Sequence, residues 1–326
     1  MIRAMDHQLT NDSYLAHLAA DGRALIAAVE AAPDARVAAC PEWTNTGLAE
    51  HVATVWNFAI AQVESGDPSG PQRPSSDPDE SMSDLLDRAV AVLSDADPDA
   101  PAWNWTDDQR AGWWCRRMAH EASVHRWDAQ EAAQTIEPID ADLATDGITE
   151  LIEVGLRFRP RGGWDLEYPN GSLHLHRTDG KGEWLLATVD GELVATFEHA
   201  KGDAAARGTA SDLLLYLWGR GRATLECFGD EELLDAWASV APSPFPSPSS
   251  RATADRTEAT GTSPVRCPRC RRRRAFRRGS RRGCESVPSC GHAGPRAVLR
   301  GPGRGVGSSL RSASAGHLRR RDGRSS

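Results

Sequence analysis

Glu121 and His125 are residues of metal-ligating type, spaced four positions apart in the segment RMAHEASVHRWD over 117–128. On a helix this spacing stacks the two side chains on one face, about 40° apart around the axis. His120 lies five positions before His125 and so about 140° away, which excludes the zinc-protease arrangement in which both histidines share a face. The pattern favours one carboxylate and one imidazole bound to a single ion. A solvated Glu/His face is the competing interpretation.

The missing ligand has to come from a facing helix, and His51 is the best candidate. Two nitrogens and one oxygen from the protein leave one position open, as in catalytic rather than structural zinc sites. Asp128, three residues after His125, is placed to accept the N–H of the His125 ring nitrogen that does not bind the ion, or an N–H of a neighbouring residue. The competing interpretation of His51 is a hydrogen-bonded core histidine, because it lies at the edge of an apolar stripe formed by Leu48, Val52, Val55 and Ala59.

The elements that carry these residues are predicted from apolar periodicity. Proline, glycine and serine clusters over 65–80 and an irregular segment over 96–110 interrupt the helical patterns. Four helices with long connections predict a helical bundle in a first domain over 1–140. The expected helices cover 8–31, 46–64, 81–95 and 112–134.

The pattern changes after about residue 140, where a second, smaller α+β domain over 141–240 is expected. The fold class is therefore α plus α+β. Asp179-Gly180 and Asp190-Gly191 are favourable hairpin turns between alternating runs. The expected helices cover 141–158, 209–218 and 230–239, and the expected strands cover 164–168, 172–178, 183–189, 192–198 and 223–228.

The chain has 326 residues, and its charge is divided very unevenly. Residues 241–326 hold 20 Arg, no Lys and 4 acidic residues, a net charge of +16, whereas residues 1–240 hold 18 basic and 42 acidic residues, a net charge of −24. The acidic part argues against nucleic acid or an anionic membrane as a partner, because both are polyanions. All 11 Trp residues lie within 1–240, which can therefore bury a substantial core.

The tail over 241–326 lacks Ile, Met, Tyr, Trp, Asn, Gln and Lys, so it is expected to be disordered. An abundance of Arg, Gly, Pro, Ser and Ala is what GC-rich DNA gives in an unselected frame, and a frameshift or read-through extension is the favoured interpretation. An Arg-rich nucleic-acid arm is one alternative. A zinc module is another, with the candidates Cys267, Cys270, Cys284, Cys290 and His292. Cys267 and Cys270 have ligand spacing, but Cys284 and Cys290 are six apart and make a poor second pair.

No segment approaches the roughly 18 apolar residues of a membrane span, and the N-terminus lacks a signal-peptide pattern. A cytoplasmic location is expected. Cys40 and Cys115 are expected to be buried, inert thiols rather than redox groups. His174 and His176 alternate on one strand face and offer a further metal-ligand pattern, although an exposed hairpin is the simpler account.

Two motifs resemble those of the mycothiol-dependent maleylpyruvate isomerase family. Residues 40–58, CPEWTNTGLAEHVATVWNF, resemble its Cys/Pro-x-Trp-Thr segment followed by Leu-x-x-His, and residues 117–128 resemble its second motif. SDLLLYLWGR and CFGDEELLDAW resemble its sterol-carrier-like companion domain. The resemblance covers most of 10–240 and implies a DinB-like four-helix bundle. It also implies a divalent metal, typically zinc, with His51, Glu121 and His125 as the matching ligand positions.

The resemblance further implies the thiol mycothiol as cofactor, in a high-GC Gram-positive bacterium. Its thiolate would add to the cis double bond of maleylpyruvate, the single bond would rotate, and elimination would give the trans product. The dianionic substrate needs a cation, and Arg220 is the nearest match to the family's late arginine, with Arg207 and Arg222 as rivals. A mycothiol S-transferase that acts on electrophiles, and a metal-binding protein without turnover, are the alternative functions.

Overall fold

The computed structural model describes residues 8–75, 77, 79–157 and 167–240, which belong to one unit of the chain. The predictions for the tail over 241–326, its disorder and its cysteine cluster, lie outside the described residues. Among the helices of the described ranges, none is long and apolar enough to cross a membrane.

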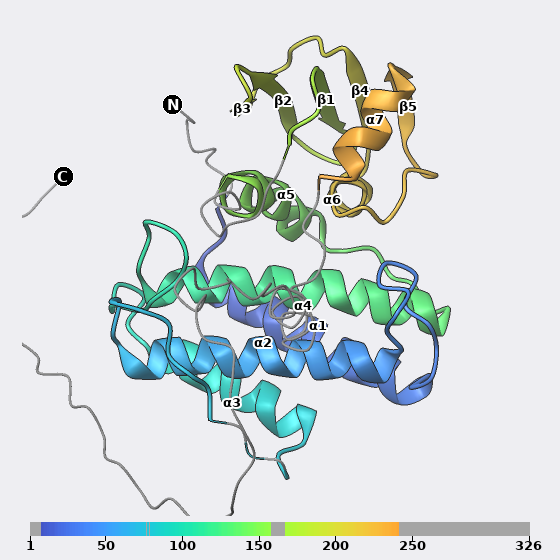
Figure 1. The fold of residues 1–326 in the computed structure, drawn as a ribbon. Helices are drawn as coiled ribbons and strands as arrows, with labels where there is room; N and C mark the ends of the chain where they lie inside the picture. The colour runs from blue at the N-terminus through green and yellow to red at the C-terminus, as the bar shows by residue number, and fades with distance from the viewer. Residues whose placement is uncertain (1–7, 76, 78, 158–166, 241–326) are drawn as a thin grey trace, which may run out of the picture. The chain divides into compact units, whose positions relative to one another are not determined.

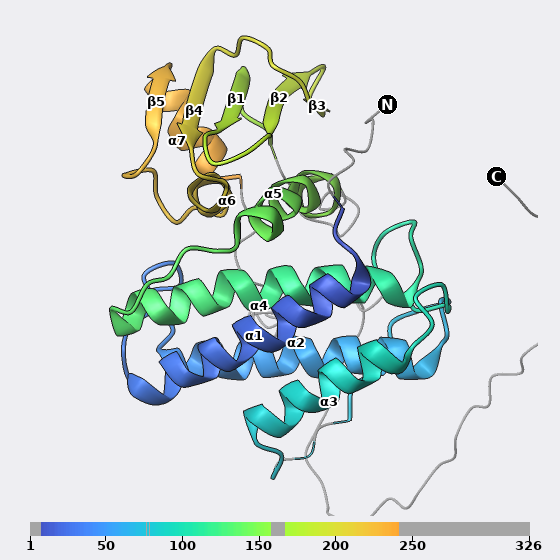
Figure 2. The same cartoon turned by 180° about the vertical axis from the view of Figure 1, so that it is seen from behind.

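Four helices form the N-terminal helical domain, as the sequence predicts (Figure 1). Three of them begin at a side chain that accepts a hydrogen bond from a backbone N–H of the first turn: Thr10, Thr44 and Ser81. Helix α1 packs along α4 and also contacts α3, while α2 packs on α3 and α4. Figure 2 shows α1 and α4 side by side. The bounds are α1 Asn11–Ala31, α2 Asn45–Ser65, α3 Met82–Asp95 and α4 Ala111–Ala133.

The C-terminal region is α+β and contains a mixed sheet of five strands in the order β3-β2-β1-β4-β5. Only β1 and β4 are parallel; the other neighbouring pairs are antiparallel. Helix α5 (Ala141–Glu150) continues into a π-helical segment, η1 (Leu151–Leu156). The remaining elements are β1 Ser172–Arg177, β2 Glu183–Val189, β3 Glu192–Thr196, β4 Ala204–Gly208, α6 Ala210–Leu217, β5 Glu226–Gly229 and α7 Glu231–Ala238. The fold class predicted from sequence is confirmed for the described residues, and the domain boundaries at 140 and 240 stay predictions.

The sheet differs from the sequence prediction in two places. Strand β4 was not expected, because the segment Ala204–Gly208 consists of three Ala, an Arg and a Gly, residues that favour strands weakly. It forms a strand because its backbone pairs with β1 on one side and with β5 on the other. The strand expected over 164–168 lies partly outside the described residues, and Glu167 and Tyr168 are not in a strand.

The two predicted hairpin turns have different outcomes. Asp190 and Gly191 both have positive φ, 53° and 83°, and directly join β2 to β3, as a two-residue hairpin requires. Asp179 and Gly180 instead belong to a longer loop between β1 and β2. There the Asp179 carboxylate accepts hydrogen bonds from the Nε of Arg177 and the backbone N–H of Ala210, which fixes the start of α6.

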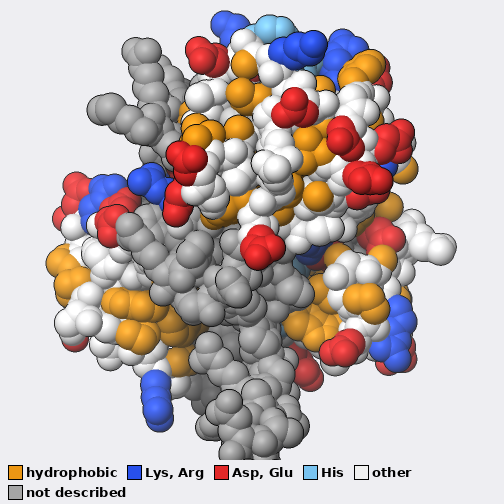
Figure 3. Space-filling model, turned by 45° about the horizontal axis from the view of Figure 1, so that its top comes forward, with side chains coloured by type: hydrophobic (Ala, Val, Ile, Leu, Met, Phe, Trp, Pro, Cys, Tyr) orange, Lys and Arg blue, Asp and Glu red, His pale blue; other side chains and the backbone are white. Residues whose placement is uncertain are grey.

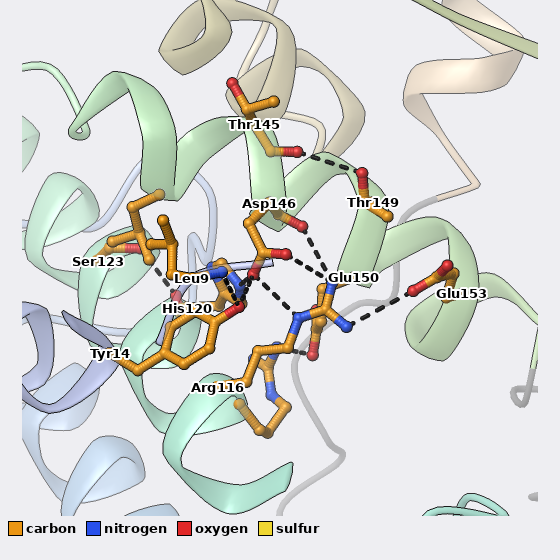
Figure 4. Close-up of polar contacts among 12 residues, drawn as sticks. Leu9, Tyr14, Arg116, His120, Ser123, Thr145, Asp146, Thr149, Glu150 and Glu153 are labelled. Atoms are coloured by element: carbon orange, nitrogen blue, oxygen red, sulfur yellow. Dashed lines mark hydrogen bonds and ion pairs between the residues drawn. The ribbon is translucent and has the colours of Figure 1, made fainter. Parts of the chain in front are cut away.

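A buried polar cluster joins α5 to the helical domain (Figure 4). The carboxylate of Asp146 accepts hydrogen bonds from the hydroxyl of Tyr14 at 2.7 Å and from Nε and Nη2 of Arg116, both at 2.9 Å. Nε2 of His120 lies 2.8 Å from Oδ2 of the same carboxylate. Burial alone would raise the pKa of Asp146, but the His120 hydrogen bond and electrostatic interactions with His120 and Arg116 lower it to about 2. Asp146 is thus a buried anion that is paired with Arg116 of α4 and also accepts a hydrogen bond from Tyr14 of α1.

We predict that Asp146→Asn destabilises the full chain by about 3 kcal/mol, because it leaves the Arg116 charge without its bidentate partner. The melting temperature, followed by circular dichroism, should fall by about 10 °C at neutral pH. The stabilising ionised form of Asp146 predominates above its ordinary pKa of 3.8 and is lost as the pH falls through about 2. The difference between variant and wild type should therefore shrink on acidification below pH 4.

Asp87→Asn is the matched control, because Asp87 is 66% exposed and makes only a 3.5 Å contact with Arg23. It should shift the free energy of unfolding by less than about 0.5 kcal/mol. Equal melting temperatures for the two variants would show that the Asp146 cluster adds no stability.

Candidate metal centre

Helix α2 positions His51 toward α4. The residues Leu48, Val52 and Ala59 of its apolar stripe are buried, which fixes the rotation of the helix about its axis. His51 follows at the edge of that stripe with a side chain 13% exposed. The ring of Trp43, in the segment before the helix, lies over the imidazole with centroids 4.9 Å apart and planes tilted by 36°. The indole limits the orientations that the imidazole can adopt.

Helix α4 presents Glu121 and His125 to the same point. Nε2 of His125 and Nε2 of His51 each lie 3.3 Å from Oε1 of Glu121. The two imidazole rings are 5.2 Å apart and nearly perpendicular. The four-residue spacing within α4 and the facing position of α2 thus bring the three predicted side chains together. His120 points away from them, to Asp146 on α5, as its spacing predicts.

The three side chains fit a divalent ion. Around a tetrahedral zinc ion, with bonds of about 2.0–2.1 Å, the ligand atoms stand about 3.3 Å apart. The observed separations between each imidazole Nε2 and Oε1 of Glu121 have this value, and one ligand atom from each of the three residues lies within 4.8 Å of the others. Two imidazoles and one carboxylate form a donor set that zinc accepts. The three residues could therefore hold one ion and leave a position free.

Arg117 orients the Glu121 carboxylate. Its Nη2 donates to Oε2 of Glu121 at 2.6 Å, while its Nη1 donates to Glu150 of α5 at 2.8 Å. Oε1 is thereby left to face the two histidines. Burial alone would raise the pKa of Glu121, but the charge of His125, hydrogen bonds from both histidines and the charge of Arg117 hold it well below its ordinary value. Glu121 is therefore ionised, as a metal ligand must be.

Asp128 fixes the second nitrogen of the His125 ring. Its Oδ2 lies 3.0 Å from Nδ1 of His125, the contact predicted from the three-residue spacing. A proton held on Nδ1 by this carboxylate leaves Nε2 as the free ligand atom. Burial alone would lower the pKa of His125, but Glu121 and Asp128 raise it to about 9. A metal ion at the centre therefore competes with a proton for Nε2.

Arg220 reaches the centre from the residues after α6. Its Nη2 and Nε donate to the two carboxylate oxygens of Asp128 at 2.6 and 3.0 Å, and its Nη1 donates to the carbonyl of Trp218 at 2.7 Å. The side chain is only 7% exposed. The buried carboxylate of Asp128 would have a raised pKa by itself, but Arg220 and His125 lower it to about 2. The Asp128 carboxylate therefore bridges Arg220 and His125.

The rival arginines lie elsewhere. Arg207 on β4 pairs with Glu226 of β5 in an exposed contact. Arg222 pairs with Glu231 and Asp235 of α7, both largely exposed. Neither has a described contact with the three candidate ligands or with Asp128.

The remaining residues that the sequence singled out pack in the core. Cys40 and Cys115 are buried, and burial raises the pKa of each thiol to about 11, so neither is a ready nucleophile. Among five tryptophans of the helical domain, only Trp43 touches a candidate ligand in the described contacts. The others form an aromatic cluster with Phe58: Trp103, Trp105, Trp113 and Trp114.

Sequence reasoning overlooked the role of Arg117 and did not identify the partner of Arg220. The spacing of four residues between Arg117 and Glu121 is a signal that could have revealed the first contact. The second joins residues 92 positions apart, and no local pattern indicates it.

Comparisons with known proteins show the family to which this architecture belongs. Residues 15–130 match the model of the mycothiol maleylpyruvate isomerase N-terminal domain, and residues 142–236 match the model described as the MDMPI C-terminal domain. Together the two family models cover well over half of the chain. The N-terminal model matches the helical domain, and the C-terminal model matches the α+β region. The chain belongs to the mycothiol-dependent maleylpyruvate isomerase family.

Two solved structures are similar to the chain at 12% identity. They are crystal structures of the mycothiol-dependent maleylpyruvate isomerase, with a TM-score of 0.47, and of a histidine-to-alanine mutant of it, with a TM-score of 0.44. Each comparison covers 75% of this chain and 99% of the other. No curated protein matches the chain.

We predict that His51→Ala removes about one zinc ion per full-length chain, because two protein ligands rarely retain zinc against dialysis. Metal content is measured by plasma mass spectrometry after dialysis against a weak chelator. His17→Ala is the control, since His17 on α1 has only a 3.9 Å contact with Asp140. Any ion held outside the centre cancels in the comparison of the two variants. Equal zinc contents would rule out His51 as a ligand.

Proposed function

We propose that the protein is a metal-dependent, mycothiol-using enzyme that isomerises a small dianionic cis-alkene, as maleylpyruvate isomerase does. The observation that carries the proposal is the meeting of His51, Glu121 and His125 at the separations expected around one tetrahedral ion. Membership of the family supports the choice of thiol and reaction class. The proposed partners are therefore a small thiol and a small anionic substrate.

A divalent metal ion, most suitably zinc, would supply a Lewis acid that favours the thiolate form of a bound thiol. The surrounding side chains prepare the ligand atoms for that ion. Arg117 holds Glu121 with Oε1 turned to the histidines, and Asp128 holds the proton of His125 on Nδ1. The high pKa of the buried Cys40 and Cys115 thiols argues against either of them as the reacting sulfur, which supports a thiol cosubstrate.

Arg220 is the proposed anchor for the substrate carboxylate. A guanidinium carries five N–H groups, and the described contacts with Asp128 and Trp218 use three of them. The two that remain could donate to an anion close to the centre. Because the side chain is buried, an interaction with a carboxylate there is stronger than it would be in water.

A mycothiol S-transferase acting on neutral electrophiles is the second candidate, and the same contacts favour it. Most of the charge of Arg220 is already neutralised by the bidentate pair with Asp128. A dianionic substrate requires a cation that is free to bind it, whereas a neutral electrophile does not. The isomerase and the S-transferase would use the same metal centre and the same thiol. They differ in whether Arg220 has to bind an anionic substrate.

Turnover assays separate these functions. The full-length, zinc-loaded protein is incubated with maleylpyruvate, and separately with a neutral electrophile such as a haloarene, each with and without mycothiol. We expect isomerisation that depends on mycothiol and is lost in His51→Ala but kept in His17→Ala. Thiol conjugation of the electrophile without isomerisation would establish the transferase instead. Absence of both activities in the loaded protein would refute an enzymatic function on these substrates and leave a metal-binding protein.

We further predict that Arg220→Lys raises the KM for maleylpyruvate at least tenfold, because lysine keeps a charge beside Asp128 but loses the planar set of donors. Zinc content should stay at the wild-type level. Arg207→Lys is the matched control, since Arg207 pairs with Glu226 at the exposed sheet edge, and its KM should not change. A variant Arg220→Lys that loses zinc while the loaded fraction keeps its KM would show that Arg220 acts only through Asp128.

A further inference from the structure

A second group of metal-ligating side chains lies on the sheet, away from the bundle. Among the described residues, two groups of three place their ligand atoms within 4.8 Å of one another: the candidate centre, and His174, Glu183 and His199. The chain has 10 histidines in all, and three of them, counting His176, converge on the single carboxylate of Glu183. We call these four residues the sheet histidine cluster.

The pairing of the strands brings the cluster together. His174 and His176 are two residues apart on β1, so both point to the same face of the sheet. Glu183 stands directly opposite His176 in the antiparallel ladder between β1 and β2. His199 follows the end of β3, and its ring centroid lies 5.1 Å from that of His174. Three separate stretches of chain therefore supply the ligand atoms.

The opposite face of the same strands is the packed one. Leu173, Leu175 and Trp184 are fully buried there, and the indole N–H of Trp184 donates to Thr149 of α5. On the face with the histidines, Phe228 of β5 is 57% exposed, and the His199 side chain is 77% exposed. Figure 3 shows histidine side chains, in pale blue, at the surface over the sheet. The cluster is thus open to solvent and to an ion, although His174 within it is 9% exposed.

The contacts within the cluster suit an ion after a small adjustment. Nε2 of His174 lies 2.6 Å from Oε2 of Glu183, while Nδ1 of His199 lies 3.4 Å from the other oxygen, Oε1. Ligand atoms around a tetrahedral ion stand about 3.3 Å apart, so the first distance has to open by less than about 1 Å and the exposed His199 has to turn toward the oxygen that binds the ion. Glu183 is 24% exposed and can move by that amount. Nδ1 of His176, 2.6 Å from Oε1, would then hold the carboxylate in place.

We propose that His174, Glu183 and His199 form a second binding site for a divalent transition-metal ion of the zinc class, with His176 as the residue that positions Glu183. Two imidazoles and one carboxylate favour zinc, cobalt or nickel over magnesium or calcium, which prefer oxygen ligands. The ion would tie the segment after β3 to strands β1 and β2. The proposal is independent of the proposed function, because it shares no residue with the bundle centre.

The test uses the full chain in a background that lacks the bundle ligands. The variant His51→Ala/His125→Ala is compared with the same variant carrying His174→Ala/His199→Ala in addition, by equilibrium dialysis with Zn²⁺. We expect the second protein to bind about one Zn²⁺ fewer per chain. Every cysteine of the chain is present in both proteins, so binding by thiolates cancels in the difference. Equal stoichiometries would overturn the proposal and leave a hydrogen-bonded cluster.

Two further measurements keep the test decisive if the alanine variants fold poorly. Glu183→Gln preserves the size of the side chain but removes the charge and replaces one acceptor oxygen with an amide donor, and it should also lower the Zn²⁺ stoichiometry by about one. His17→Ala in the same background should leave it unchanged. Co²⁺ bound at the cluster should give the d–d absorption of a nitrogen and oxygen site, without the charge-transfer bands of thiolate ligands. Co²⁺ spectra and Zn²⁺ counts identical in Glu183→Gln and its parent would overturn the assignment.

Discussion

The charged residues of α4 from Arg116 to Asp128 are buried or half-buried, and each is paired with an opposite charge on α4 itself or on another element. Arg116 is neutralised by Asp146 of α5, and Arg126 by Asp21 of α1 at 3.0 Å. A buried charge without its partner costs several kcal/mol, so these elements are held where the pairs can close. Glu121, on the same helix, is neutralised by Arg117 from one side and by the two imidazoles from the other. The candidate centre is thus part of the charge pairing that assembles the protein.

The residues of the centre could be predicted because their signals are local. A spacing of four places Glu121 and His125 on one face of any helix, whatever surrounds it. His51 was identifiable because a histidine at the edge of an apolar stripe has to face a neighbouring helix. The structure brings these three together, while the presence of an ion and the choice of zinc stay predictions.

Other features depend on contacts between distant parts of the chain, and for that reason the sequence does not reveal them. Strand β4 has a weak intrinsic preference and exists because β1 and β5 pair with it on both sides. The cluster around Asp146 joins three helices through residues that look separately like surface polar groups. The sheet histidine cluster was interpreted from two alternating histidines as an exposed hairpin, because the position of His199 is set by the chain path after β3.

The pair formed by Asp128 and Arg220 couples the two parts of the chain energetically. The carboxylate that orients His125 has its counter-ion encoded 92 codons downstream, beyond α6. Because both charges are buried, a substitution at either position leaves the other without its partner. A change in the C-terminal region can therefore alter the orientation of His125 without touching that ring.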